Sequence, residues 1–128
     1  MLEKINHIGV AVKSIEETLP FYRDALGMTF MGTEEVAEQK VRVAFLQVGE
    51  SKIELLEPMS EESAVAKFLQ KNGPGIHHIA YEVSDLAEAL AALEAQGLSL
   101  IDRVPRQGAH GARIAFLHPK STGSVLTE

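Results

Sequence analysis

Two histidines and two glutamates stand at positions where their side chains could bind a metal ion. His7 lies in the apolar run INHIGVAV, and His78 lies in the similar run GIHHIAYEV. Glu54 is flanked by isoleucine and leucine in KIELLE, and Glu128 ends the run SVLTE. A buried carboxylate without a partner costs several kcal/mol, so such groups are normally paired or bound to metal. Because the chain contains no cysteine, imidazole and carboxylate groups must hold any such ion, which favours a divalent metal with nitrogen and oxygen ligands.

Each of these residues also has an ordinary explanation. A single histidine in an apolar strand is usually a structural residue whose ring nitrogens are satisfied by hydrogen bonds. Glu54 could face solvent, on the side of its strand opposite to its two apolar neighbours. Glu128, the last residue of the sequence, could belong to a frayed terminus. The metal interpretation therefore depends on whether the four positions are related to one another.

An internal repeat relates them. Residues 5–19 (INHIGVAVKSIEETL) align with residues 76–90 (IHHIAYEVSDLAEAL) at an offset of 71, which places His7 on His78. The same offset places residues 40–46 (KVRVAFL) on residues 111–117 (GARIAFL). After a gap of three in the preceding turn, Glu54 and Glu128 are equivalent at an offset of 74. Each copy thus supplies one histidine and one glutamate, and pseudo-twofold symmetry can bring equivalent strands to one centre.

Each copy reads as a strand, a helix and three further strands. Ser14 with Glu17, and Asp85 with Glu88, form capping boxes at the starts of the two helices. Successive side chains on a strand point to opposite faces, so His77 should face away from the side that His78 faces. The order β-α-β-β-β occurs twice, which predicts an α+β fold. We expect one domain over residues 1–128, with units at about 4–58 and 75–128 and a linking helix at about 63–72.

Composition excludes several classes of protein. The formal charge of −6 argues against nucleic acid as a partner. No apolar run approaches the roughly 20 residues that span a bilayer, so we expect no membrane segment. The start MLEKINHIGV lacks the basic and apolar regions of a secretory signal. These features predict a cytoplasmic protein.

The complete pattern resembles the vicinal oxygen chelate superfamily, also called the glyoxalase/bleomycin-resistance fold. Within it, the chain is similar to the methylmalonyl-CoA epimerases on NHIGVAV, FYRDALG, ELLEP, SAVAKFLQKNGPGIHHIAYEV and GAHGARIAFLHPKSTGSVLTE. The resemblance implies a cupped mixed sheet around a metal held by His7, Glu54, His78 and Glu128. It also implies a homodimer with an acyl-CoA substrate. The implied cofactor is a divalent ion, with cobalt as the first choice, although the same ligands would also take zinc, nickel, manganese or magnesium.

The activity implied by the resemblance is the epimerisation of methylmalonyl-CoA. The α-proton next to the thioester is removed, the metal stabilises the enolate, and a proton returns on the opposite face. Glu128 corresponds to one of the family's bases. The other catalytic glutamate aligns with Val43 and is missing, so Glu54 is our replacement candidate and Glu38 the second choice. His110, in the glycine-flanked loop GAHG, either contacts substrate or is an exposed loop histidine.

Two other functions stay open at this stage. A glyoxalase I-like isomerase (a lactoylglutathione lyase) would use the same ligands on a glutathione adduct. A metal-free small-molecule-binding protein of the same fold would not need them. An extradiol dioxygenase is disfavoured, because it requires only two histidines and one carboxylate. Metal analysis of the purified protein separates the binding protein from the enzymes, and assays with the two substrates separate the enzymes from each other.

Overall fold

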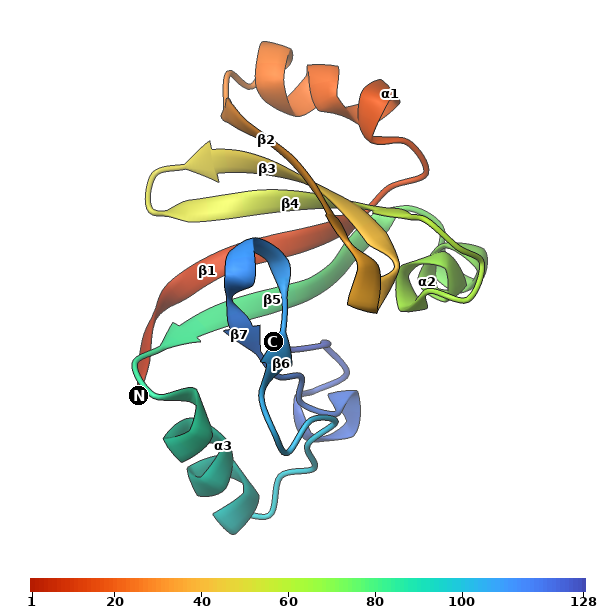
Figure 1. The fold of residues 1–128 in the computed structure, drawn as a ribbon. Coiled ribbons are helices and arrows are strands. Elements are labelled where there is room, and N and C mark those ends of the chain that lie inside the picture. The colour runs from red at the N-terminus through yellow and green to blue at the C-terminus, as the bar shows by residue number, and fades with distance from the viewer.

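The computed structural model describes residues 1–128 as a mixed five-stranded sheet flanked by helices (Figure 1). The strands lie in the order β2-β3-β4-β1-β5. The first strands of the two repeats, β1 and β5, are therefore neighbours in one sheet. This arrangement confirms the predicted α+β class. The strands span Leu2–Ala11 (β1), Thr29–Val36 (β2), Val41–Val48 (β3), Ser51–Pro58 (β4) and Gly75–Val83 (β5), with a separate short pair, Arg106–Gln107 (β6) and Arg113–Ile114 (β7).

The helices begin where the sequence predicts. The side chains of Ser14 and Asp85 accept hydrogen bonds from the backbone N–H groups of Glu17 and Glu88, which confirms the N-caps. At Pro20 the first helix changes from an α-helix into a π-helix, because proline cannot continue the regular hydrogen-bond ladder. None of the helices is both long and apolar enough to cross a membrane. The helices span Ile15–Pro20 (α1), Phe21–Ala25 (η1), Ala37–Gln39 (η2), Ala64–Asn72 (α2), Leu86–Ala95 (α3), Ala109–Gly111 (η3) and Pro119–Ser121 (η4).

The pairing of the strands repeats between the two halves of the chain. In the first half, β1 pairs in parallel with β4 through Ile8 and Ile53; in the second, Ile79 pairs in parallel with Thr127. Both pairs obey the sequence offsets, 71 on one strand and 74 on the other. Between the halves, β1 and β5 run antiparallel, with Ile8 opposite Ile79. Equivalent residues therefore face each other across a pseudo-twofold axis between β1 and β5.

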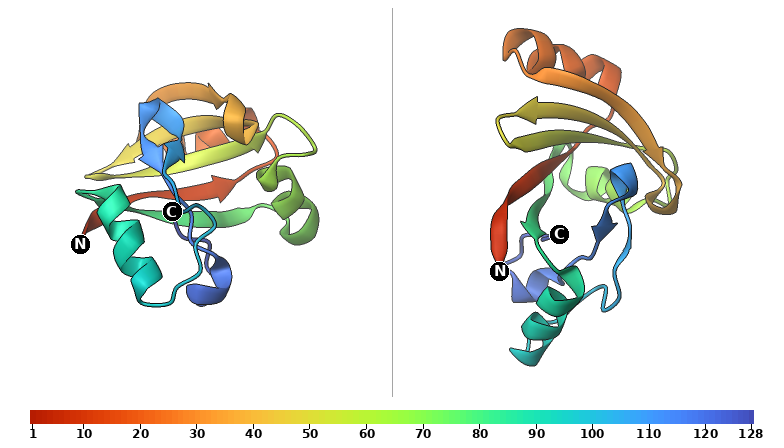
Figure 2. Two further views of the ribbon diagram at one scale, coloured as in Figure 1. Left: turned by 60° about the horizontal axis from the view of Figure 1, so that its bottom comes forward. Right: turned by 60° about the vertical axis from the view of Figure 1, so that its left-hand side comes forward.

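The second half is less regular than the sequence suggests. Three full strands were expected after α3, but there the structure has only β6, β7 and isolated bridges at Leu100, Leu117 and Thr127. Proline and glycine interrupt the segment, and a proline has no N–H to offer a neighbouring strand. The views in Figure 2 show this segment lying over one face of the sheet, where η3 contacts β2.

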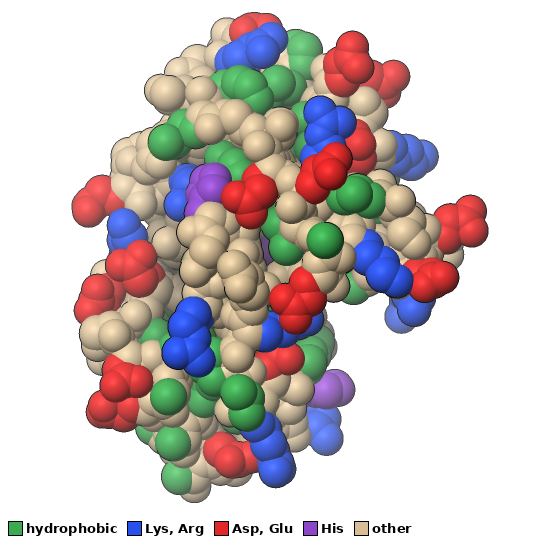
Figure 3. Space-filling model, in the orientation of Figure 1, with side chains coloured by type: hydrophobic (Ala, Val, Ile, Leu, Met, Phe, Trp, Pro, Cys, Tyr) green, Lys and Arg blue, Asp and Glu red, His purple; other side chains and the backbone are tan.

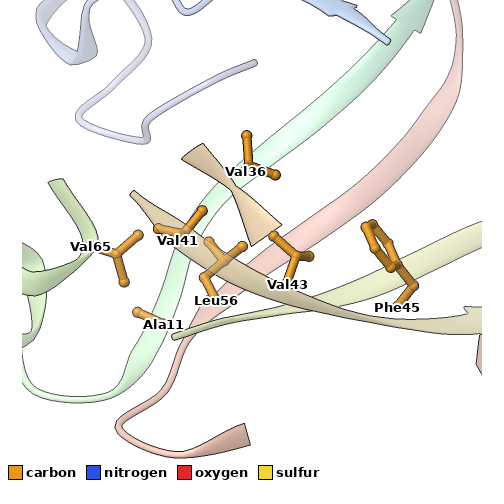
Figure 4. Packing of buried hydrophobic residues seen from close by; sticks show 7 residues of the cluster. All are labelled: Ala11, Val36, Val41, Val43, Phe45, Leu56 and Val65. Carbon is orange, nitrogen blue, oxygen red and sulfur yellow. The ribbon is translucent and has the colours of Figure 1, made fainter. Parts of the chain in front are cut away.

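The sheet has an apolar cluster on each face. On one face Ile15 and Leu19 of α1 pack against the strands. On the other face a second cluster lies beside the predicted metal ligands, since Phe45 is directly opposite Glu54 in the β3–β4 register. This second cluster, drawn in Figure 4, consists of Ala11, Val36, Val41, Val43, Phe45, Leu56 and Val65. The predicted ligands therefore stand on a well-packed, rigid surface.

Candidate metal centre

Three predicted ligands meet on the inner face of the sheet. His7 projects from β1, His78 from β5, and Glu128 from the last bridged segment, which β5 holds by backbone hydrogen bonds. The Nε2 atoms of the two histidines are 3.0 Å apart. Glu128 Oε1 lies 2.9 Å from His78 Nε2 and 3.4 Å from His7 Nε2. One ligand atom from each residue lies within 4.8 Å of the others, as a site for a divalent metal ion requires.

Gly9 makes room for this cluster. It pairs with His78 on one side and with Glu54 on the other, so it lies directly beneath the site. A Cβ atom at this position would be 2.3 Å from His78 Cε1, well inside van der Waals contact. The imidazole of His78 therefore packs on bare backbone. Only glycine permits that approach.

Glu54 lies at the edge of the cluster. Its Oε2 atom is 3.2 Å from Nδ1 of His7, which is the ring nitrogen on the side opposite to Nε2. It is buried, as expected of a paired carboxylate, and it lines the same cavity as the other three residues. Three of the four predicted ligands therefore converge directly, and Glu54 adjoins them through His7.

The two glutamates differ in their electrostatic environments. Burial raises the pKa of the Glu54 carboxyl above its ordinary value, and the charge of His7 only partly offsets this effect. Burial also acts to raise the pKa of Glu128, but hydrogen bonds and charge interactions with His7 and His78 outweigh it. The pKa of Glu128 falls to about 2. The pKa values of these two equivalent residues are thus shifted in opposite directions.

His77 does not face away from His78, so this part of the sequence prediction is wrong. The register between β1 and β5 skips one residue, from Gly9 opposite His78 to Val10 opposite Ile76. The skip leaves His77 as the extra residue of a β-bulge, and such a residue is re-aimed relative to regular alternation. Its Nδ1 atom lies 2.9 Å from Nδ1 of His78. Burial, with the charge of His78 in addition, lowers the pKa of His77 to about 4.

His110 lies apart from the cluster. Its backbone N–H donates to both carboxylate oxygens of Glu34, at 3.0 and 3.1 Å, and its backbone is left-handed with a φ of 56°. Its ring stacks on Phe45 with the centroids 3.9 Å apart. The ring of His110 is half-exposed. The preceding residue, Ala109, lines the cavity.

A cavity of about 210 Å³ opens over the cluster. The buried side chain of Val43 lines this cavity. Because it is a valine, this position supplies no carboxylate. A second pocket of about 340 Å³ lies beside α2, where the molecular surface is indented in Figure 3. Glu38 and His77 line this second pocket, and His78 lines both. Sequence reasoning missed three polar residues of the first cavity, namely Asn6, Gln39 and Glu82. Of these, only Asn6 carried a signal, because it is next to His7.

Comparison with known proteins identifies the family. Residues 6–116 match the Glyoxalase/Bleomycin resistance protein/Dioxygenase superfamily, so the chain belongs to this superfamily. It is closely related to the methylmalonyl-CoA epimerases. An ethylmalonyl-CoA/methylmalonyl-CoA epimerase of Cereibacter sphaeroides is 38% identical over 100% of this chain and 97% of its own length. A solved methylmalonyl-CoA epimerase in complex with methylmalonyl-CoA and ammonium is 42% identical, with a TM-score of 0.95, over 99% of this chain and 92% of its own.

Two further relatives set the limits of this similarity. The uncharacterized protein YqjC of Bacillus subtilis is 50% identical over 99% of this chain and 91% of its own length. A lactoylglutathione lyase of Haemophilus influenzae is more distant, at 30% identity over 96% of this chain and 98% of its own. The relationship to epimerases is thus full-length, and a more distant one to lyases exists beside it.

Proposed function

We propose that this chain is a metal-dependent epimerase acting on methylmalonyl-CoA. The observation that carries the proposal is the convergence of His7, His78 and Glu128 at the centre of the repeat, where all three line one open cavity. The full-length relationship to methylmalonyl-CoA epimerases supports the choice of substrate. Neither the fold nor a single ligand would be enough, because one fold hosts many activities.

The donor set fits a divalent ion. His7 and His78 would bind it through Nε2 and Glu128 through Oε1, since these atoms already point at one another. Glu54 is the fourth ligand of our proposal, and its Oε2 atom lies 3.2 Å from Nδ1 of His7. Two imidazoles and carboxylates suit several divalent ions, and of these we propose cobalt first, with zinc, nickel, manganese or magnesium as alternatives. When bound, the ion would polarise the thioester and carboxylate oxygens and stabilise the charge of an enolate.

The residues of the chain would handle the proton. Epimerisation needs two groups on opposite faces of the α-carbon, one to accept the proton and one to return it. Glu54 and Glu128 come from equivalent strands of the two repeats and flank His7 on opposite ring nitrogens. We assign the two roles to them. Glu38, which lines the neighbouring pocket, is the alternative second base because Val43 has no acidic group.

His110, which is next to the cavity-lining Ala109 in the sequence, is our candidate for a substrate contact. The carboxylate of Glu34 holds the loop by accepting a hydrogen bond from the backbone N–H of His110. The half-exposed ring is then available to an acyl group. The apolar lining of the cavity suits the methyl branch of a methylmalonyl group, while the surrounding polar residues suit its carboxylate.

The second candidate function is a lactoylglutathione lyase. The observation in its favour is the full-length relative of Haemophilus influenzae. The same metal and the same two carboxylates could move a proton between adjacent carbons of a glutathione adduct. A metal-free binding protein is disfavoured, because it has no use for two buried histidines with their Nε2 atoms 3.0 Å apart.

A paired assay tests the proposal. The purified protein is stripped with a chelator, reloaded with cobalt, and incubated in deuterated water with methylmalonyl-CoA or with the methylglyoxal–glutathione adduct. We expect epimerisation with α-deuterium incorporation for methylmalonyl-CoA only, and only after reloading. His7→Gln is the inactive control, and His118→Gln, a change at an exposed histidine, is the active one. Turnover of the adduct alone would establish the lyase, and no metal uptake would refute both enzymes.

A further inference from the structure

Each candidate ligand histidine has its Nδ1 atom against the side chain that precedes it in the sequence. Asn6 Oδ1 lies 2.8 Å from Nδ1 of His7. His77 Nδ1 lies 2.9 Å from Nδ1 of His78. Asn6 and His77 are themselves equivalent in the repeat, at the offset of 71.

Both contacts depend on a break in regular strand pairing. The register between β1 and β5 jumps from Ile5 to His7, and it jumps again between His78 and Ile76. These shifts leave Asn6 on one strand and His77 on the other without a cross-strand partner. In a regular strand each would point away from its neighbouring histidine, but a bulge changes the direction of the extra side chain. The two irregularities therefore occur at equivalent places with the same result.

The contact has a chemical consequence for the histidines. A neutral imidazole carries one proton, and it can bind a metal through Nε2 only when that proton is on Nδ1. A hydrogen-bond acceptor placed at Nδ1 favours this tautomer, and such outer partners commonly fix the orientation of metal-binding histidines. Asn6 provides an amide oxygen, held toward His7 because its Nδ2 donates to Glu82 at 3.1 Å.

We propose that the bulged residues Asn6 and His77 are a matched pair of positioning residues that accept the Nδ1 protons of His7 and His78. Each keeps the Nε2 lone pair of its histidine directed at the metal position. This inference rests on the metal role given under the proposed function. It assigns His77 the tautomer with its proton on Nε2. The rings of Phe68 and His77 pack edge to face, with their centroids 5.1 Å apart, which supports the position of His77.

His77 offers the cleaner test of the pair. His7 has a second acceptor, because Glu54 Oε2 also lies near its Nδ1 at 3.2 Å. Loss of the Asn6 amide can therefore be covered by Glu54. His78 has no such reserve among the hydrogen bonds of its Nδ1 atom, where His77 is its partner.

The experiment measures cobalt affinity by absorption titration. His77→Phe keeps a ring against Phe68 but removes the acceptor, and we expect about 10- to 100-fold weaker cobalt binding. His77→Asn installs the residue that the first repeat uses, and affinity should return to within about threefold of the original protein. His118→Phe is the control, since it makes the same chemical change at an exposed histidine. A packing role alone would not distinguish asparagine from phenylalanine in this way.

A spectroscopic measurement makes the test independent of variant folding. In the zinc-loaded protein, nitrogen-15 spectra should show His78 protonated on Nδ1 and His77 unprotonated there. The reverse assignment would overturn the inference, as would equal cobalt affinity for His77→Phe and the original protein. Failure of the original protein to bind any divalent ion would instead refute the metal role itself, and this inference with it.

Discussion

Replacing Gly9 with alanine should displace His78 and disable the metal site while the sheet stays folded. The added Cβ would lie 2.3 Å from Cε1, 2.6 Å from Nδ1 and 2.8 Å from Nε2 of the His78 ring. Carbon atoms in ordinary contact are about 3.5–4.0 Å apart. The ring must therefore retreat by roughly 1 Å or more.

The size of that movement sets the expected loss. Ligand distances in metal sites hold to within about 0.2 Å, so a retreat several times larger removes His78 from the ligand set. We expect Gly9→Ala to weaken cobalt binding at least about 100-fold, which is about 2.7 kcal/mol of binding free energy. Overpacking of this kind also costs about 1–3 kcal/mol of folding free energy.

The assay compares Gly9→Ala with Gly75→Ala, a glycine of the same sheet. A Cβ at Gly75 would meet nothing within 4 Å. Gly75→Ala should therefore bind cobalt normally and be unchanged or stabilised by up to about 1 kcal/mol, through a more restricted unfolded chain. Urea unfolding gives the stabilities, and absorption titration gives the affinities.

The refuting result is specific. If Gly9→Ala folds and binds cobalt within threefold of the original protein, the ring of His78 does not need the space above Gly9. The close packing of His78 on β1 would then not be what fixes the ligand. Unfolding of Gly9→Ala would also contradict the reasoning, because the predicted folding cost is only about 1–3 kcal/mol.

Four further outcomes follow from the same residues. Glu54→Gln and Glu128→Gln should each abolish epimerisation, and they should differ in which epimer still exchanges its α-proton with deuterated water. If Glu54→Gln retains metal and near-normal turnover, the second base lies elsewhere, and Glu38 is the next candidate. Metal at about 100 times its Kd should raise the free energy of unfolding by about 2.7 kcal/mol over the chelated protein, measured by urea titration; no shift would contradict a folded-state site. Ser63→Ala should cost about 1–2 kcal/mol, because the buried hydroxyl accepts the Ala66 N–H at 3.0 Å, and more than the exposed Ser14→Ala. Light scattering should give a homodimer, and a stable monomer at micromolar concentration would disprove that expectation.

The features that sequence reasoning could reach are those with local or periodic causes. The caps at Ser14 and Asp85 are set by side chains three residues from their partners. The repeat predicted that Ile8 and Ile79 are equivalent, and in the structure they pair directly across β1 and β5. Duplication was the informative signal, because it relates residues far apart in the chain without any knowledge of contacts.

The features that it missed arise from contacts between distant strands. The prediction that His77 faces away assumes regular alternation, which holds only where strand pairing is regular. The bulge that breaks the alternation appears only when β5 is aligned on β1. The position of Glu54 beside Nδ1 of His7, rather than beside Nε2, depends on side-chain geometry that spacing does not contain. Gly9 looked like an ordinary strand residue, and its role is visible only once His78 lies above it.

Duplication creates a symmetric site, and small differences between the copies can give its two halves different tasks. Asn6 and His77 hold equivalent places but offer Nδ1 an amide oxygen in one half and a ring nitrogen in the other. Glu54 and Glu128 are equivalent as well, yet burial raises the pKa of the first carboxyl while hydrogen bonds from the histidines lower that of the second to about 2. A reaction that takes a proton from one face and returns it to the other requires two similar groups in different states. We propose that the divergence of the two repeats fits Glu54 and Glu128 for these two roles.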